Sequence, residues 1–158
     1  MKKHSQLLVT TLKDHQLTLA LAESMTCGLA AHRLSGCIGT SDVLKGSIVC
    51  YSPELKCGLM QVSEKMIDTY TCESKEVTEA LVKNLSKVVK ADVYAAITGL
   101  ASPGGSETKE KPVGTVFFSI RKGKKIHNYK KALQGSPLEI KKKACETLYK
   151  LILSALDL

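Results

Sequence analysis

The chain has 158 residues, of which 44% are hydrophobic and 24% are charged, values ordinary for a single globular domain. Aromatic residues make up 4% and Trp is absent, which argues against the base-stacking platforms of single-strand nucleic-acid binders. No run approaches the ~18 apolar residues that a membrane span needs. The six cysteines show no zinc-site spacing and no secretory signal is recognisable before them, so we expect reduced cysteines in a cytoplasmic protein.

The net charge of +8 is concentrated in the C-terminal third. Residues 1–100 carry 11 Lys and Arg against 10 Asp and Glu, whereas residues 101–158 carry 12 against 5. Such a basic region could face nucleic acid, a membrane surface or a phosphorylated small molecule. Because its lysines alternate with apolar positions, a solvated protein face is the favoured interpretation.

The first elements in chain order predict a helix, a buried strand, a turn and a second helix. Residues 3–15 place leucines and a valine on one helical face, and the nearly all-apolar run 17–22 is typical of a strand buried on both sides. The small polar segment 23–28 then leads into a helical pattern from residue 29. Such a strand–turn–helix arrangement can aim free backbone N–H groups at an anion, although the glycines are too few for a P-loop.

The remaining elements complete an alternating pattern. Residues 47–51 predict a second strand, and Pro53 suits the first turn of a short helix that carries Lys56. Further elements are expected as helices at 63–70 and 74–91 capped by Ser63 and Ser74, a buried strand at 92–98, a hairpin of 113–121 and 126–133, and a last helix at 137–156. This order predicts an α/β fold, a three-layer α/β/α sandwich with a mixed, mainly parallel sheet.

Two connections carry candidate chemistry. The glycine-rich loop GLASPGGS (99–106) follows a buried strand, which is where ligands of open α/β sheets bind. Residues 39–56 place Ser41, Tyr51 and Lys56 on one connection, and a serine attacks amides when a neighbouring base such as a desolvated lysine takes its proton. A loop serine, a strand tyrosine and a solvated lysine would fit the same spacing.

Three segments together resemble one family. AESMTCG (22–28) is similar to that family's AESCTGG, GTSDVLKGSIVCYSPELK (39–56) to its G-(S/A)-S…YSNE-x-K block, and ITGLASPGGSETKEKPVGT (97–115) to its ITGIAGPGGGSEEKPVGT. This is the CinA C-terminal domain family, whose stand-alone members, called PncC, hydrolyse the amide of nicotinamide mononucleotide. The resemblance extends over nearly the whole chain, so residues 1–158 are expected to form one such domain.

The resemblance implies a reaction that converts nicotinamide mononucleotide and water to nicotinic acid mononucleotide and ammonia, with no metal and no cofactor. It makes Ser41 the nucleophile, Tyr51 and Lys56 the groups that activate it, and Thr98 a further site residue. Chemically, Lys56 would accept the serine proton, through Tyr51, and backbone N–H groups with the Thr98 hydroxyl would stabilise the oxyanion.

The residues expected to bind substrate lie in the same three segments and in the last helix: Glu23, Ser24, Thr26, Gly28, Gly39, Gly99, Gly104, Gly105 and Lys141. Several alternatives stay open. Ser24 and Thr26 could be simple helix caps, Glu23 could be paired structurally, and Thr98 could bond its own backbone. We expect a small nucleotide substrate and a homodimer, and neither nucleic acid nor a membrane as a partner.

Four positions depart from the family pattern. Cys27 and Ser102 replace glycines, Pro53 replaces the Asn of YSNE, and Pro137 replaces an arginine that precedes the last helix. Cys27 thereby places a side chain where the backbone approaches the ligand or has a φ that L-residues avoid. The departures leave a catalytically silent nucleotide-binding domain as a second hypothesis besides an active amidohydrolase. The basic charge suggests a third, a nucleic-acid-associated protein with salt-sensitive binding, against which the low aromatic content argues.

Overall fold

A five-stranded sheet forms the centre of the computed structural model, which describes residues 2–157. The strand order is β2-β1-β3-β4-β5, with bounds β1 (Leu19–Glu23), β2 (Leu44–Val49), β3 (Val93–Gly99), β4 (Thr115–Lys122) and β5 (Lys125–Ala132). Strand β1 pairs in parallel with β2 and β3, whereas β4 pairs antiparallel with both β3 and β5. Only β4 therefore runs against the other strands, as the predicted mixed, mainly parallel sheet requires.

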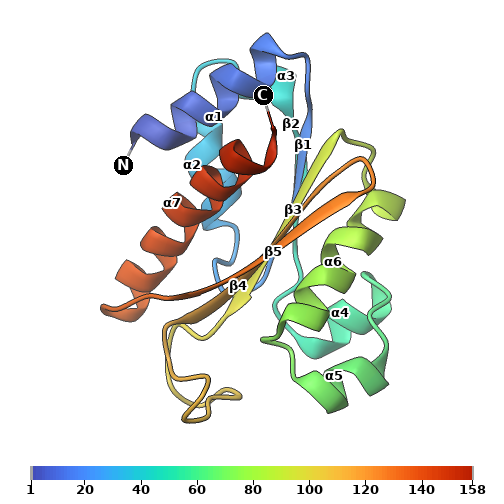
Figure 1. The fold of residues 1–158 in the computed structure, drawn as a ribbon, viewed down its shortest axis with the longest axis vertical. Helices are drawn as coiled ribbons and strands as arrows, with labels where there is room; N and C mark the ends of the chain where they lie inside the picture. Colours follow the sequence, from blue (N-terminus) through green and yellow to red (C-terminus); the bar gives the residue numbers. More distant parts are fainter. Residues whose placement is uncertain (1, 158) are drawn as a thin grey trace.

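Helices cover both faces of the sheet (Figure 1), which confirms the three-layer prediction. One layer holds α1 (Lys2–Asp14), α2 (Leu29–Ser35) and α7 (Pro137–Ala155), and the other holds α4 (Pro53–Gly58), α5 (Glu64–Tyr70) and α6 (Lys75–Val88). Ser63 and Ser74 cap α5 and α6 as expected, because their hydroxyls accept from the N–H groups of Met66 and Val77.

Two details before β2 differ from the prediction. A short helix, α3 (Thr40–Val43), was not expected, and β2 begins at Leu44 rather than at residue 47. The helix forms because Gly39 takes a left-handed φ of 89° and the Thr40 hydroxyl donates to the Leu34 carbonyl oxygen at 2.5 Å. Backbone pairing with β1, in which Leu44 stands opposite Leu19, sets the start of β2. Neither the start of α3 nor the pairing of β2 with β1 produces a periodic hydrophobic pattern, so the sequence alone did not predict them.

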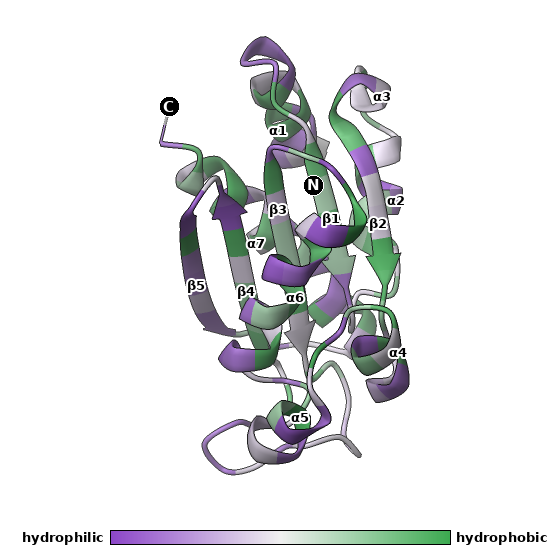
Figure 2. Cartoon of the chain, turned by 90° about the vertical axis from the view of Figure 1, so that its right-hand side faces the viewer, coloured by the Kyte–Doolittle hydropathy of each residue, from purple (hydrophilic) through white to green (hydrophobic). Residues whose placement is uncertain are grey.

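The sheet divides the core in two, which explains the all-apolar run at its centre. Leu19 and Leu21 belong to the cluster under α1, α2 and α7, whereas Ala20 and Ala22 belong to the cluster under α6. Successive residues of a strand point to opposite faces, so a strand that is covered on both sides needs apolar residues throughout. Figure 2 shows the contrast with the hydrophilic edge strand β5.

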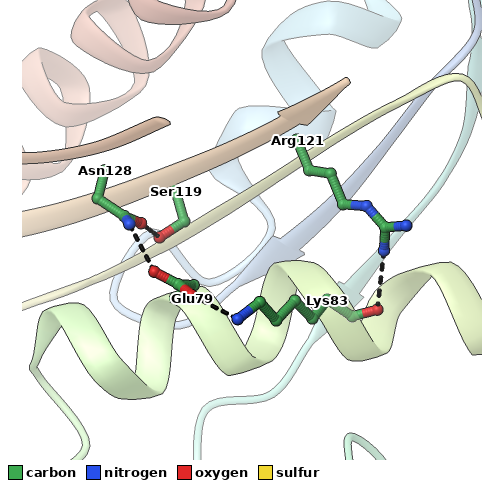
Figure 3. A network of polar contacts seen from close by, with 5 residues as sticks. All are labelled: Glu79, Lys83, Ser119, Arg121 and Asn128. Atoms are coloured by element: carbon green, nitrogen blue, oxygen red, sulfur yellow. Dashed lines mark hydrogen bonds and ion pairs between the residues drawn. The ribbon is translucent and has the colours of Figure 1, made fainter. Parts of the chain in front are cut away.

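Polar contacts attach the β4–β5 hairpin to α6 (Figure 3). Glu79 of α6 pairs with Lys83 one turn later and accepts a hydrogen bond from the Asn128 amide at 2.6 Å. Asn128 in turn accepts from the Ser119 hydroxyl at 2.6 Å, and Arg121 donates to the Ser86 hydroxyl at 2.8 Å. The outer half of the sheet is thus joined to α6 by charge-assisted hydrogen bonds.

Asp92 links the beginnings of β1 and β3, and its replacement gives a prediction for stability against pH. Its carboxylate accepts from the Thr18 hydroxyl at 2.6 Å and the Thr18 N–H at 2.8 Å, and the hydroxyl contact is the main reason that the pKa of Asp92 is lowered. A lowered folded pKa stabilises the protein above the unfolded pKa, and this stability is lost as pH falls through the folded pKa. We expect Asp92→Asn to cost about 1 kcal/mol near neutral pH, a modest value because the group is exposed. Urea unfolding should show the difference shrinking below about pH 4, and a constant difference would contradict this account.

Candidate functional site

A cavity of about 220 Å³ opens where the three neighbouring parallel strands end. Ser24 follows β1, Tyr51 lies just beyond β2 and Leu100 follows β3. The cavity is lined by Met25, Tyr51, Glu73, Gly99, Leu100, Ala101, Ser102, Pro103, Gly104, Gly105, Pro137 and Lys141. The site thus lies at the carboxyl edge of the sheet, as expected for an open α/β fold.

Lys56 supplies a fully buried amine that contacts the backbone of Tyr51, a residue of the cavity lining, although neither Lys56 nor Ser24 is itself in that lining. The residue lies on α4, where Ser52 is the N-cap and Pro53 occupies the first turn. Its Nζ donates to the carbonyl oxygens of Cys50 at 2.8 Å and Tyr51 at 3.1 Å, and to the Ser24 hydroxyl at 3.1 Å. Three oxygen partners satisfy the buried amine, and burial also raises the pKa of the neighbouring Cys50 thiol.

Ser41 lies at the other end of β2. It is an exposed residue of α3, which precedes the strand, whereas Lys56 follows the strand. A six-residue strand spans about 20 Å, so the structure separates Ser41 from Lys56. Gly39 lies with Ser41, against Lys13 of α1 and away from the cavity. Ser24 is therefore the serine that the fold brings to Lys56.

Glu23 has a structural role at the turn after β1. Its buried carboxylate accepts from the Thr26 hydroxyl at 2.7 Å and from the Gly28, Ala30 and Ala31 N–H groups at 2.9–3.1 Å, and from the Ser47 hydroxyl at 2.9 Å. These contacts place a carboxylate at the N-terminus of α2, where negative charge is favoured. Glu23 thus occupies the N–H groups at the start of α2 that could otherwise face an anion, and Thr26 and Gly28 serve that structural contact.

The other residues expected in catalysis have different surroundings. The Thr98 hydroxyl is buried and pairs with the Thr78 hydroxyl of α6 at 2.8 Å, away from the cavity lining. The Tyr51 side chain lines the cavity and is 59% exposed, and it is the Tyr51 carbonyl, not the phenol, that contacts Lys56. Tyr51 therefore faces the cavity rather than linking Lys56 to a serine.

The glycine loop and α7 form another part of the wall. Gly99, Gly104, Gly105 and Lys141, which are among the residues predicted to bind substrate, all line the cavity. A Cβ at Gly99 would lie 2.7 Å from the Thr115 carbonyl oxygen, so only glycine fits there. The N–H groups of Gly104 and Gly105 donate to the two oxygens of Glu107, and the Gly104 contact lowers the pKa of that carboxyl.

The four departures from the family pattern fall into two groups. Cys27 is exposed with a left-handed φ of 49°, as its replacement of glycine suggested, and Pro53 occupies a position in α4 where its missing N–H is not needed. Neither lines the cavity. Ser102 and Pro137 do line it, so these two replacements change the surface that a ligand meets.

Glu73 also lines the cavity, although it is not among the residues predicted to bind substrate. It lies between α5 and α6, directly before the cap Ser74. No motif in this segment marks it, and only the folding of the glycine loop against residues 71–73 places it in the wall.

The fold and the cavity together define a mixed α/β domain with a buried serine–lysine contact at the carboxyl edge of its parallel strands. Residues 1–156 match the family described as the CinA C-terminal domain, and the chain belongs to that family.

Curated relatives include CinA-like proteins of Mycobacterium avium (45% identity over 105 residues, 66% of this chain and 24% of the relative) and Thermotoga neapolitana (38% over 119 residues, 75% and 29%). The chain thus spans only about a quarter to a third of their length. Solved structures show the same fold: a competence damage-inducible protein A from Klebsiella pneumoniae (TM-score 0.93, 22% identity, 99% of this chain and 96% of the other) and a CinA superfamily protein from Escherichia coli (0.91, 25%, 96% and 88%).

Within residues 2–157, none of the helices has the length and apolar character that crossing a membrane requires.

Proposed function

We propose that the protein is an amidohydrolase that converts nicotinamide mononucleotide to nicotinic acid mononucleotide and ammonia, with Ser24 as the nucleophile and Lys56 as the proton acceptor. The observation that carries the proposal is the 3.1 Å contact between the Lys56 Nζ and the hydroxyl of Ser24, which directly precedes the cavity residue Met25. A serine hydroxyl attacks a carbonyl efficiently when a base accepts its proton, and a buried lysine suits that role. Family membership and the resemblance to PncC supply the substrate.

Two backbone carbonyl groups beside Lys56 orient its amine toward the Ser24 hydroxyl. When the amine is neutral, its two N–H bonds can be donated to the carbonyl oxygens of Cys50 and Tyr51, at 2.8 and 3.1 Å. The lone pair is then left to face the Ser24 hydroxyl and accept its proton. The two carbonyl groups thus hold the base in the orientation that proton transfer needs, with no rearrangement.

The reaction then proceeds in two steps. The Ser24 Oγ attacks the carboxamide carbon as its proton passes to Lys56, and the tetrahedral intermediate collapses as Lys56 returns the proton to the departing ammonia. Water hydrolyses the resulting ester by the reverse proton path, which releases the acid and restores Ser24. Within the described residues, no acceptor bonds the N–H groups of Met25 and Thr26, so these groups after the nucleophile are free to hold the oxyanion.

The cavity wall suits a pyridine nucleotide. Tyr51 presents an aromatic ring on which a pyridinium ring can stack, and cations bind favourably over such faces. Lys141 offers a positive charge for the phosphate from the first turns of α7. With the α2 N-terminus occupied by Glu23, Lys141 is the cation of the cavity lining that we assign to the phosphate.

The experiment that tests the proposal is incubation of the purified protein with nicotinamide mononucleotide. We expect ammonia and nicotinic acid mononucleotide in equal amounts, measured by an enzymatic ammonia assay and by chromatography. Nicotinamide, which lacks the ribose phosphate, should react far more slowly, because binding energy away from the reacting amide contributes to the rate. Absence of both products would refute the proposal.

A silent nucleotide-binding domain is the second candidate, and a particular observation favours it. Ser102 and Pro137 alter the cavity wall, whereas the contact between Ser24 and Lys56 remains. Binding of nicotinamide mononucleotide in calorimetry without ammonia release would support this candidate over the amidohydrolase.

A further inference from the structure

The cavity contains one carboxylate and one amine that do not pair with each other. Glu73 and Lys141 are the acidic and basic side chains of its lining, and no ion pair within 4.0 Å joins them among the described residues. Opposite charges that face one cavity without meeting leave room for a ligand that carries both an anion and hydrogen-bond donors. Sugar phosphates have this combination.

Neighbouring residues hold the Glu73 side chain in place. One of its oxygens, Oε2, accepts a hydrogen bond from the Ser106 hydroxyl at 2.5 Å. The Lys111 amine donates to the Ser106 hydroxyl at 2.9 Å, to the Glu73 carbonyl oxygen at 3.0 Å and to the Thr71 hydroxyl at 2.6 Å. This cluster attaches the glycine loop to the segment before α6, and it fixes the carboxylate before any ligand binds.

The other oxygen of the Glu73 carboxylate is free. Within residues 2–157, no hydrogen bond involves Oε1, although the residue is partly buried. A carboxylate with a fixed conformation and an unused oxygen in a cavity is a good acceptor for a hydroxyl group. Acidic side chains recognise the ribose hydroxyls of dinucleotides in this way at the carboxyl edge of other α/β sheets.

We infer that Glu73 is a specificity-determining residue that accepts hydrogen bonds from the ribose 2′- and 3′-hydroxyl groups of the ligand, while Lys141 contacts its phosphate. The assignment rests on the proposed function for the identity of the ligand, and it names the part of the ligand that the cavity selects. The assignment also explains why a negative charge, that of Glu73, faces a site proposed for an anionic ligand. The carboxylate repels the phosphate and so favours one orientation of the ligand over the reverse.

The test compares two ligands in matched variants. Nicotinamide mononucleotide and its 2′,3′-dideoxy counterpart are titrated by calorimetry into Ser24→Ala protein, which should not consume them. We expect the dideoxy ligand to bind about tenfold or more weakly, because hydrogen bonds to charged groups are strong. Adding Glu73→Ala should reduce this ratio to about one, whereas Glu110→Ala, which removes an exposed carboxylate of the loop between β3 and β4, should leave it unchanged.

The ratio separates recognition from structural damage. If Glu73 had a purely structural role, Glu73→Ala would weaken the binding of both ligands equally and leave the ratio of their affinities unchanged. That result would overturn the inference. Equal binding of both ligands by the parent protein, or binding of neither, would overturn it as well. Should Glu73→Ala fail to fold, Glu73→Gln, which keeps the shape, should lower the ratio without abolishing it.

The same titrations distinguish this inference from the proposed function. A ribose preference that depends on Glu73, in a protein that releases no ammonia, would retain the inference and refute the deamidation. Ammonia release by a protein that binds both ligands equally would support the deamidation and refute the inference about Glu73.

Discussion

Replacing Ser24 by alanine is expected to abolish ammonia release from nicotinamide mononucleotide, with a loss of about 10⁴-fold or more in kcat. Loss of a nucleophilic serine has effects of this size, because the remaining groups still bind and polarise the substrate but form no covalent intermediate. Ser24 is 5% exposed and 3.1 Å from the Lys56 amine, and removal of one hydroxyl leaves the packing of the turn intact. Ammonia release under saturating substrate is the measurement.

The matched control is Ser41→Ala, because the resemblance to the family assigns the nucleophile to Ser41. Ser41 is exposed and lies beyond the opposite end of β2, so the change should leave kcat unchanged and alter stability by less than about 0.5 kcal/mol. Thermal melting of both variants would show that each is folded. An inactive Ser41→Ala beside an active Ser24→Ala would return the role to Ser41 and require a different arrangement of the site.

The sequence predicted the elements well where local signals determine them. The apolar run before Glu23 and the caps Ser63 and Ser74 gave a strand and two helices close to their observed places. Pro53 correctly indicated the helix that carries Lys56. These signals are local, because hydrophobic period and capping act within a few residues of the chain.

The partner of Lys56 could not be chosen from spacing along the chain. Ser41 and Lys56 are close in sequence, but β2 runs between them and places them at opposite ends of that strand. Ser24 is 32 residues from Lys56, yet both follow the carboxyl ends of neighbouring parallel strands. The carboxyl ends of parallel strands lie at the same side of the sheet, and ligands bind there in open α/β folds. This rule favours Ser24 as the partner of Lys56 once β1 and β2 are known to be adjacent.

The role of Glu23 and the selection of Glu73 needed the folded structure. A buried glutamate at the end of a strand is equally compatible with a structural and a ligand-binding role, and the choice depends on which N–H groups the turn directs at it. Glu73 lines the cavity only because Ser106 of the glycine loop and Lys111 beyond it contact residues 71–73. Long-range contacts of this kind produce no periodic pattern in the sequence, so they could not be predicted from it.

Replacing Lys56 by methionine is the second change with a large expected effect. Methionine occupies a similar volume without an amine, so the Ser24 hydroxyl loses its proton acceptor and kcat should fall by about 10²–10⁴-fold. The carbonyl oxygens of Cys50 and Tyr51 also lose a donor, for which we expect a destabilisation of about 1–3 kcal/mol, measurable by urea unfolding. Arginine should not restore activity, because its planar group is larger and remains charged.

Lys141→Met distinguishes a base from a positive charge that merely attracts the substrate. Lys141 lines the same cavity from α7 and does not contact Ser24, so its loss should raise KM while kcat stays near the parent value. Such a result means that uniform binding was removed, whereas a fall in kcat for Lys56→Met means that an interaction made in the transition state was removed. If Lys56→Met instead raised KM alone, Lys56 would be a binding residue, and the proton acceptor for Ser24 would have to be another group.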